Sequence, residues 1–141
     1  MMTASNGTSW PRIWLGFLCG AAFVLPVAGF AEDCTAPQTN LQMQTCAEAD
    51  FEKADKRLNI DYKAARKYMD SIDDNLPANL KGASDALLDA QRDWIKYRDA
   101  ACFAEGFIVR GGREEPLIVT TCKTELTQER SKQLRDLAAS E

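Results

Sequence analysis

The stretch "FEKADKRLNIDYKAARKYMDSI", residues 51–72, sets the fold of this chain. Its apolar side chains recur in steps of three and four residues, which is the spacing of one face of an α-helix. The members of this face are Phe51, Ala54, Leu58, Tyr62, Ala65, Met69 and Ile72. Upstream, "TNLQ" at residues 39–42 has the pattern of a capping box, so the helix is predicted to begin after Thr39. Pro77 and Gly82 interrupt the pattern downstream and predict where the helix ends.

Two later segments repeat the helical spacing. The second helix is predicted through Leu80, Ala83, Leu87, Ala90, Trp94, Tyr97 or Arg98, and Ala101, ending near Gly106. The third is predicted through Leu126, Arg130, Leu134 and Leu137. The short apolar runs "FIV" (107–109) and "LIV" (117–119) are the only strand candidates. The sequence contains no repeat, so it predicts an all-α fold, a small bundle of three to four helices.

Residues 1–31 have the features of a cleaved Sec signal peptide. An apolar run spans residues 13–29, and "GFA" at residues 29–31 places small residues at the −3 and −1 positions of a cleavage site. A membrane anchor is the alternative, but the run is short for a span and Pro26 interrupts it. We therefore expect residues 32–141 to form a single helical domain, periplasmic or secreted, with no membrane anchor after cleavage.

Four cysteines follow the predicted cleavage site: Cys34, Cys46, Cys102 and Cys122. An even number of cysteines in a small exported domain predicts two disulfides, with three connectivities possible. Geometry favours the local pairing, because Cys46 would lie only roughly 10 Å along the first helix and the preceding segment can fold back that far. Cys34–Cys46 would then pin the N-terminal arm, and Cys102–Cys122 would close a helix–loop–helix. Each bridge should contribute roughly 3 kcal/mol to stability.

The charged composition restricts the function classes. The chain carries a net charge of −4 and no histidine. An acidic domain is a poor ligand for nucleic acid or anionic lipid, and it is compatible with a basic partner. The absence of histidine excludes Ser-His and Cys-His catalysis and histidine-ligated zinc. No sequence feature predicts a metal or another cofactor.

The segment "RDWIKYRDAACFAEG", residues 92–106, places the charged residues Arg98 and Asp99 next to each other. They could form a polar site, but packing within the bundle is the favoured interpretation. Arg98 would lay its stem on the core and pair with Asp55 or Glu125. Because adjacent helical residues do not face each other, Arg98 and Asp99 are expected to have different partners. The residues assigned structural roles are Asp55, Leu58, Asn59, Tyr62, Trp94, Tyr97, Arg98 and Asp99.

Three segments in this order carry a family resemblance. They are "QMQTCAEADFEKADKRLNIDY" (42–62), "LLDAQRDWIKYRDAACFAEG" (87–106) and "CKTELTQERSKQL" (122–134), with Cys34 before the first and a Gly-Gly loop before the last. Together they resemble the LprI-type lysozyme-inhibitor family of small exported bacterial proteins, over about residues 34–137. The resemblance implies a protein partner, c-type lysozyme, which is a small basic muramidase whose cleft is flanked by carboxylates. An acidic domain would be steered electrostatically towards such an enzyme.

The segment "FIVRGGREEPLI", residues 107–118, is the predicted contact loop. The candidate partner-binding residues are Arg110, Gly111, Gly112, Arg113, Glu114 and Glu115. The two glycines give the loop turn freedom, and a Cys102–Cys122 bond would hold it at both ends, which lowers the entropy lost on binding. Either arginine could pair with a carboxylate of the lysozyme cleft.

Catalysis is a weaker alternative. The adjacent carboxylates Glu114 and Glu115, or Asp73 and Asp74, could be considered as an acid–base pair. A glycosidase, however, needs carboxylates that face each other across a cleft, and neighbouring residues give no sign of that arrangement. The protein is therefore not expected to be an enzyme.

A second non-enzymatic alternative is an envelope-stress or adaptor module that binds another protein or a glycan. Its candidate groove is marked by Tyr62, Tyr68, Trp94 and Tyr97. Aromatic residues at helical spacing more often belong to a core. Asn59 lies between two positions of the apolar face and is expected to bond the backbone of a neighbouring segment.

Overall fold

The structure is a computed structural model that describes residues 34–140, so the predicted signal peptide lies outside the described residues. The elements are α1 (Asn40–Asn75), η1 (Ala78–Leu80), α2 (Ala83–Gly106), η2 (Phe107–Val109) and α3 (Glu115–Ala138). The predicted all-α bundle is confirmed. Both strand candidates were wrong: residues 107–109 form a 3-10 turn and residues 117–119 belong to α3. Within residues 34–140, none of the helices combines the length and apolar character that crossing a bilayer requires.

Helix α1 is the long element on which the others pack, at 36 residues or about 54 Å. The predicted capping box is present. The Gln42 backbone N–H donates to Thr39 Oγ1 at 3.1 Å, and the Thr39 N–H donates to Gln42 Oε1 at 3.2 Å. Reciprocal bonds of this kind satisfy amides of the first turn that have no partner inside the helix. The start of α1 is therefore encoded locally.

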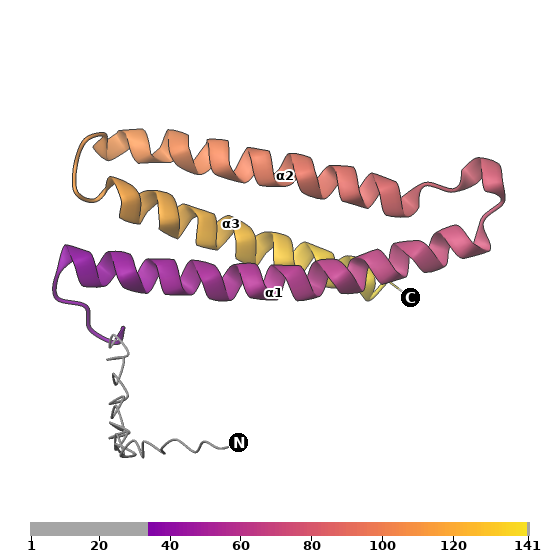
Figure 1. Cartoon of the computed structure of the whole chain (residues 1–141), viewed down its shortest axis with the longest axis horizontal. Coiled ribbons are helices and arrows are strands. Elements are labelled where there is room, and N and C mark those ends of the chain that lie inside the picture. Colours follow the sequence, from indigo (N-terminus) through magenta and orange to yellow (C-terminus); the bar gives the residue numbers. More distant parts are fainter. Residues whose placement is uncertain (1–33, 141) are drawn as a thin grey trace, which may run out of the picture. The chain divides into compact units, whose positions relative to one another are not determined.

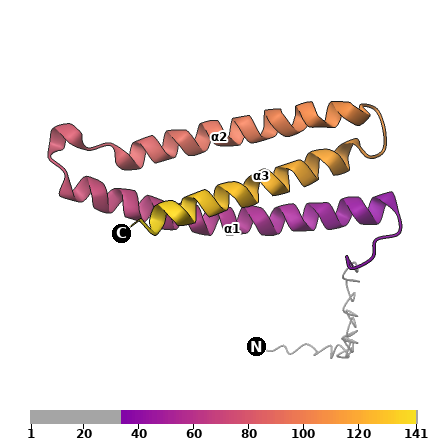
Figure 2. The ribbon, with the colours of Figure 1, turned by 180° about the vertical axis from the view of Figure 1, so that it is seen from behind.

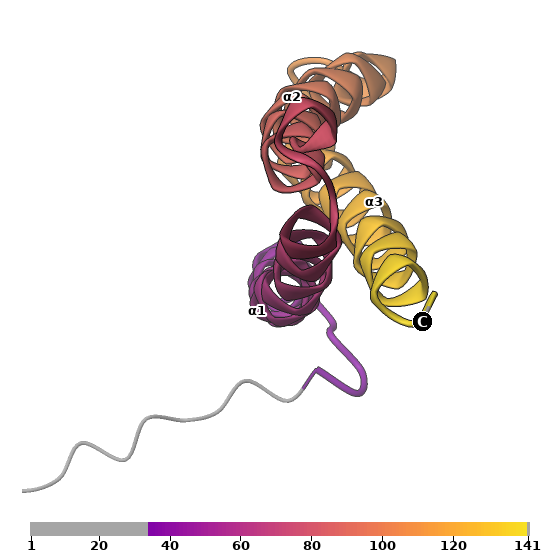
Figure 3. The ribbon, with the colours of Figure 1, turned by 90° about the vertical axis from the view of Figure 1, so that its right-hand side faces the viewer.

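The three helices lie side by side (Figure 1, and from behind in Figure 2), and α3 packs more extensively on α1 than on α2. Seen from the side in Figure 3, α3 lies beside the plane that contains α1 and α2. The start of α1, the end of α2 and the start of α3 meet at one end of the bundle. We call this end, residues 34–50 and 102–128, the head.

Both disulfides lie in the head and have the predicted local pairing. Cys34 bonds Cys46 with their Cα atoms 5.6 Å apart, and Cys102 bonds Cys122 with their Cα atoms 5.5 Å apart. The first bond fastens residues 34–39, the N-terminal arm, to α1, and the second joins α2 to α3. The head is thus cross-linked twice.

The bundle has a small apolar core. Leu58, Ala65, Leu87 and Leu134 are buried, and partly buried Tyr62, Met69, Trp94, Leu137 and Ala138 pack against them. The predicted faces of α1 and α3 are confirmed by these residues. On α2 the prediction was only partly right, because Leu80 and Tyr97 are 61% and 62% exposed while Arg98 turns inward. Ala90 is also exposed.

A buried carboxylate joins α1 to α3. Asp61 accepts hydrogen bonds from the Ser131 hydroxyl, from Arg135 Nη1 at 2.6 Å and from Arg57 Nε at 3.1 Å. Burial favours a higher pKa for Asp61, but the hydrogen bonds from Ser131, Arg57 and Arg135 outweigh it and lower the pKa below its ordinary value. The ionised form therefore stabilises the packed state.

Asp73, near the end of α1, caps the start of α2. Its carboxylate accepts the backbone N–H groups of Ser84, Gly82 and Ala83 at distances of 3.0, 2.8 and 2.9 Å. These three bonds lower the pKa of Asp73 from its ordinary value. Since the residue before α2 is Gly82, which has no side chain to cap the helix, Asp73 supplies the missing acceptor.

Candidate partner-binding site

The predicted contact loop is shorter than the sequence indicated. Helix α3 begins at Glu115, so residues 115–118 are helical and only residues 110–114 form the turn between η2 and α3. Pro116 stands in the first turn of α3, where its fixed φ and missing N–H are tolerated. Glu115 is acidic and lies at the positive end of the helix dipole. These two residues were the signal for an early helix start.

The turn is held by one carboxylate. Glu115 accepts the Gly111 backbone N–H at 2.8 Å through Oε2 and the Arg110 guanidinium through Oε1. The bond from Gly111 and the interaction with Arg110 lower the pKa of Glu115, against the opposing effect of burial. Gly111 has a φ of 78°, which disfavours residues with a Cβ. A Cβ on Gly112 would lie 2.9 Å from the Val109 carbonyl oxygen. The turn therefore has a defined shape.

An aromatic and cationic cluster projects from the head beside this turn. The Arg110 guanidinium lies 5.2 Å from the ring centroid of Phe103 and 4.7 Å from that of Phe107. Phe103, Phe107 and Ile108 are 51%, 54% and 80% exposed. We call Phe103, Phe107, Ile108 and Arg110 the head patch. Phe103 was not among the predicted contact residues, and the signal for it was a large apolar residue outside the core-facing positions of α2.

The six predicted contact residues lie together, but their charges are used differently. Arg110 and Glu115 form an ion pair with each other, so much of their charge is compensated within the turn. Arg113 and Glu114 are exposed, and within the described part of the chain neither forms an ion pair. The cation that the turn offers to a partner is therefore Arg113, while Arg110 is part of a stacked surface.

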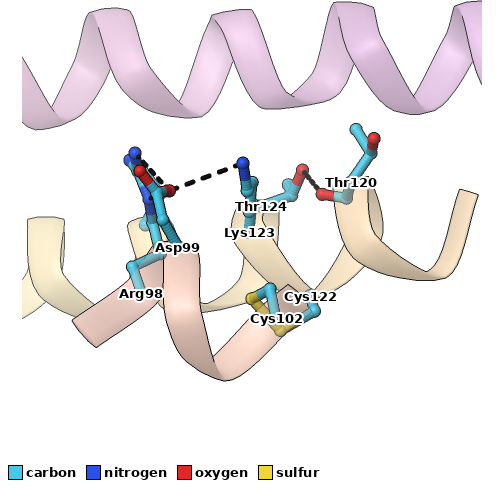
Figure 4. Close-up of a disulfide and its surroundings, with 8 residues drawn as sticks. Arg98, Asp99, Cys102, Thr120, Cys122, Lys123 and Thr124 are labelled. Atoms are coloured by element: carbon cyan, nitrogen blue, oxygen red, sulfur yellow. Dashed lines mark hydrogen bonds and ion pairs between the residues drawn. A yellow bond between two sulfur atoms is a disulfide. The ribbon is translucent and has the colours of Figure 1, made fainter. Parts of the chain in front are cut away.

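The buried guanidinium of Arg98 lies at the junction of the three helices. Figure 4 shows Arg98, Asp99 and Lys123 pointing toward α1, with the Cys102–Cys122 bond on the other side. Arg98 donates to Asp99 Oδ1 at 3.0 Å, and Lys123 approaches the same oxygen at 3.5 Å. The expectation of different partners for Arg98 and Asp99 was wrong, because a long arginine side chain can curl around the helix to its neighbour.

The remaining contacts of Arg98 reach the other helices. Its guanidinium lies 3.9 Å from Asp55 Oδ1 and 3.4 Å from Thr127 Oγ1. It also lies 5.3 Å from the ring centroids of both Phe51 and Trp94. Asp55 is thus a partner as predicted, whereas Glu125 is not. With donors satisfied from three helices, Arg98 has a packing role.

Asn59 does not reach a neighbouring segment, so that prediction was wrong. Its amide donates at 2.9 Å to both the Asp55 carbonyl oxygen and Asp55 Oδ2, one turn earlier in α1. The side chain is exposed. With Asp55 and Tyr62 of α1 and Arg92 of α2, it lines a shallow groove of about 230 Å³. This groove carries both signs of charge.

A larger groove of about 430 Å³ lies in the head between the N-terminal arm, α1 and α3. We call it the head groove. Met43, Ala47 and Asp50 line it from α1, and Leu117, Thr121 and Glu125 line it from α3. Cys34 and Pro37 line it from the arm. Its surface combines apolar groups with two carboxylates.

Comparison with known proteins adds the family. The family model described as "Lysozyme inhibitor LprI" matches residues 31–134. This chain belongs to the LprI family. It is 39% identical over 111 residues to the uncharacterized protein R02472 of Rhizobium meliloti (strain 1021), covering 77% of this chain and 80% of that relative. In structure it is similar to a DUF1311 family protein from Pseudomonas putida KT2440, with a TM-score of 0.63, 21% identity and coverage of 75% of this chain and 100% of the other.

The segments that carried the LprI resemblance supply the interior of the bundle. Cys46, Leu58, Gln91, Arg98 and Cys102 all come from them and all are buried. The turn of the head lies between two of these segments and contributes only its glycine pair, Gly111 and Gly112, to the resemblance. Membership of the LprI family therefore accounts for the framework, and the case for the contact surface depends on the geometry of the head.

Proposed function

We propose that this LprI-family protein is an exported, non-enzymatic inhibitor of c-type lysozyme that contacts the enzyme through the head patch and the turn at residues 110–114. The observation that carries the proposal is the exposure of Phe103, Phe107 and Ile108 in one cluster. Contiguous exposed apolar groups on a soluble protein mark interaction sites. Aromatic residues and arginine are also the types that contribute most to protein interfaces.

The rigidity of the head supports the same proposal. The turn is enclosed by the Cys102–Cys122 bond and braced by Glu115, which accepts bonds from Arg110 and Gly111. A surface that is already ordered loses less conformational entropy when it binds. The head can therefore enter a cleft with little rearrangement.

Charge supports a basic enzyme as the partner. The chain has a net charge of −4, which favours encounter with a cationic protein. At the contact itself, exposed Arg113 can pair with a carboxylate of the lysozyme cleft. The two effects differ in salt dependence, since long-range steering is screened and a desolvated pair is screened less.

An exported location fits the cysteine usage of residues 34–140. Cys34, Cys46, Cys102 and Cys122 are all bonded in pairs. Such bonds persist in oxidising compartments such as the bacterial periplasm. We therefore place the protein in the periplasm or outside the cell.

The test is a cell-wall turbidity assay with c-type lysozyme and the oxidised protein comprising residues 32–141. Wild type should inhibit lysis in a dose-dependent manner. Phe107→Ala should weaken inhibition about tenfold or more, as removal of an interface anchor does. Ile60→Ala is the matched control, because Ile60 is an exposed apolar residue on α1 (59%) outside the head. Equal inhibition by both variants, or no inhibition by folded wild type, would contradict the proposal.

The second candidate, an adaptor for another protein or a glycan, is favoured by one observation. Of the aromatic residues that marked the predicted groove, Tyr97 is 62% exposed on α2, while Tyr62 and Trp94 pack against the core. If the surface around Tyr97 is the binding surface, Tyr97→Ala should abolish capture of a periplasmic partner while Phe107→Ala leaves it intact. The opposite pattern would favour the head.

A further inference from the structure

The head groove combines carboxylates with the absence of a cation, whereas the groove beside Asn59 is lined by arginine as well as aspartate. Asp50 and Glu125 line the head groove, and no lysine or arginine does. Within residues 34–140 neither carboxylate forms an ion pair. Some exposed carboxylates elsewhere, such as Asp93 and Asp136, are paired with a lysine of their own helix, but what sets Asp50 and Glu125 apart is that both line one groove. The groove therefore keeps two uncompensated negative charges.

The remaining walls of the groove are apolar or neutral. Met43 and Ala47 of α1 and Leu117 of α3 present apolar groups, and Thr121 presents a hydroxyl. Lysine and arginine side chains combine an apolar stem with a charged end, and they bury the stem along apolar surfaces while the end remains near water or a carboxylate. A volume of about 430 Å³ is ample for one such side chain.

We propose that the head groove receives a lysine or arginine side chain of the basic partner, with the stem along Leu117 and the cationic end between Asp50 and Glu125. The groove and the head patch lie at the same end of the bundle, the groove between the arm, α1 and α3 and the patch where α2 ends. A single partner can thus engage the head patch and the groove together. The identity of the partner as lysozyme rests on the proposed function, but the chemistry of the groove can be tested without lysozyme.

The first experiment uses small probes on the isotopically labelled protein. Nα-acetylarginine amide should cause saturable shifts of the backbone amide signals of Ala47 and Thr121. Nα-acetylcitrulline amide, which has the same shape but no charge, should bind at least about threefold more weakly, as expected for loss of exposed ion pairs. Equal binding of the two probes, or shifts confined to other regions, would overturn the proposal.

Matched variants assign the effect to the two carboxylates. Asp50→Asn/Glu125→Gln should reduce binding of the arginine probe to the level of the citrulline probe. Asp70→Asn/Asp74→Asn removes the same charge from exposed positions at the other end of α1 and should leave probe binding unchanged. Thermal melts of both variants verify that they are folded. Unchanged probe binding by the groove variant would refute the assignment.

Measurements with lysozyme separate the two proposals. If wild type binds lysozyme and the groove variant binds it at least about threefold more weakly than the control variant, both proposals are supported. If both variants bind lysozyme equally, the groove proposal fails and the proposed function stands. If wild type does not bind lysozyme but the groove binds the arginine probe, the proposed function fails and the groove remains a site for another basic protein.

Discussion

Replacing Asp61 with Asn tests the buried junction between α1 and α3. Asp61 is 2% exposed and accepts bonds from Arg57, Ser131 and Arg135. The side chains of Arg57 and Arg135 are 55% and 43% exposed, so water can replace part of the interaction that each loses with the carboxylate. Each loss should therefore cost only about 0.5 kcal/mol. Ser131 is 2% exposed, and weakening its bond to a charged acceptor costs about 1.5 kcal/mol. The substitution should therefore lower the free energy of unfolding by about 2.5 kcal/mol.

The assay is urea and thermal unfolding of both proteins, followed by circular dichroism from neutral to acidic pH. A loss of this size corresponds to a decrease in melting temperature of roughly 10 °C for a domain of this length. The pKa of Asp61 is lower in the folded state, so its stabilisation is present above the ordinary value of 3.8 and is lost as the pH falls through the folded pKa. The difference between wild type and variant should accordingly close in acid.

Asp70→Asn is the control, because Asp70 is an exposed carboxylate on the same helix. It should change the free energy of unfolding by less than about 0.5 kcal/mol. The reasoning is refuted if Asp61→Asn is as stable as this control at neutral pH. It is also refuted if the difference from wild type stays constant down to acid pH, because the ionised form would then contribute nothing.

Three further predictions concern a disulfide, a helix cap and the glycine of the turn. Replacing Cys102 and Cys122 with Ala should lower the free energy of unfolding by about 3 kcal/mol in denaturant titrations, since the bond closes a separation of 20 residues, and should weaken lysozyme inhibition. Asp73→Ala should melt below Asp74→Ala at neutral pH, with the gap closing as the pH falls below 3.8, because the folded-state pKa of Asp73 is lowered. Gly111→Ala should cost about 1 kcal/mol and Gly111→Asn less, because φ there is 78°.

The elements that were predictable from sequence are those specified by local chemistry. The capping box of Thr39 and Gln42 fixes the start of α1, and the helical spacing of apolar residues identifies the face that contains Leu58 and Ala65. The disulfide pairing followed from proximity along the chain. In each case the information lies within a short stretch of sequence, at most 20 residues apart for the bonded cysteines, so no knowledge of the partner helices was needed.

The errors concern residues whose environment is created by other helices. At the end of α2, Tyr97 and Arg98 are both compatible with the inner face, and hydrophobicity alone favours the tyrosine. Arg98 is buried because Phe51, Thr127 and Asp99 surround its guanidinium, and two of these come from other helices. Sequence patterns do not reveal such a set of partners in advance.

At the head patch the opposite happens: apolar residues with helical spacing are exposed instead of buried. Phe103 and Phe107 lie one turn apart and contact each other edge to face, so their spacing is that of core residues. They are exposed because they lie off the buried face of α2, which contains Arg98 and Cys102 at this end. The spacing between the two rings is helical, so what distinguishes them from core residues is their offset from the buried positions Leu87, Arg98 and Cys102.

The placement of both disulfides in the head has a consequence for local unfolding. At the opposite end, α1 and α2 are connected through the Asp73 cap, and the chain terminus is held by a bond from the Tyr68 hydroxyl to the Ser140 carbonyl oxygen at 3.2 Å. Regions held by a few exposed hydrogen bonds open with less free energy than cross-linked ones. Hydrogen exchange and proteolysis should therefore begin at the far end. A partner surface in the head would keep its shape during these openings, so binding and local unfolding would take place at separate ends of the bundle.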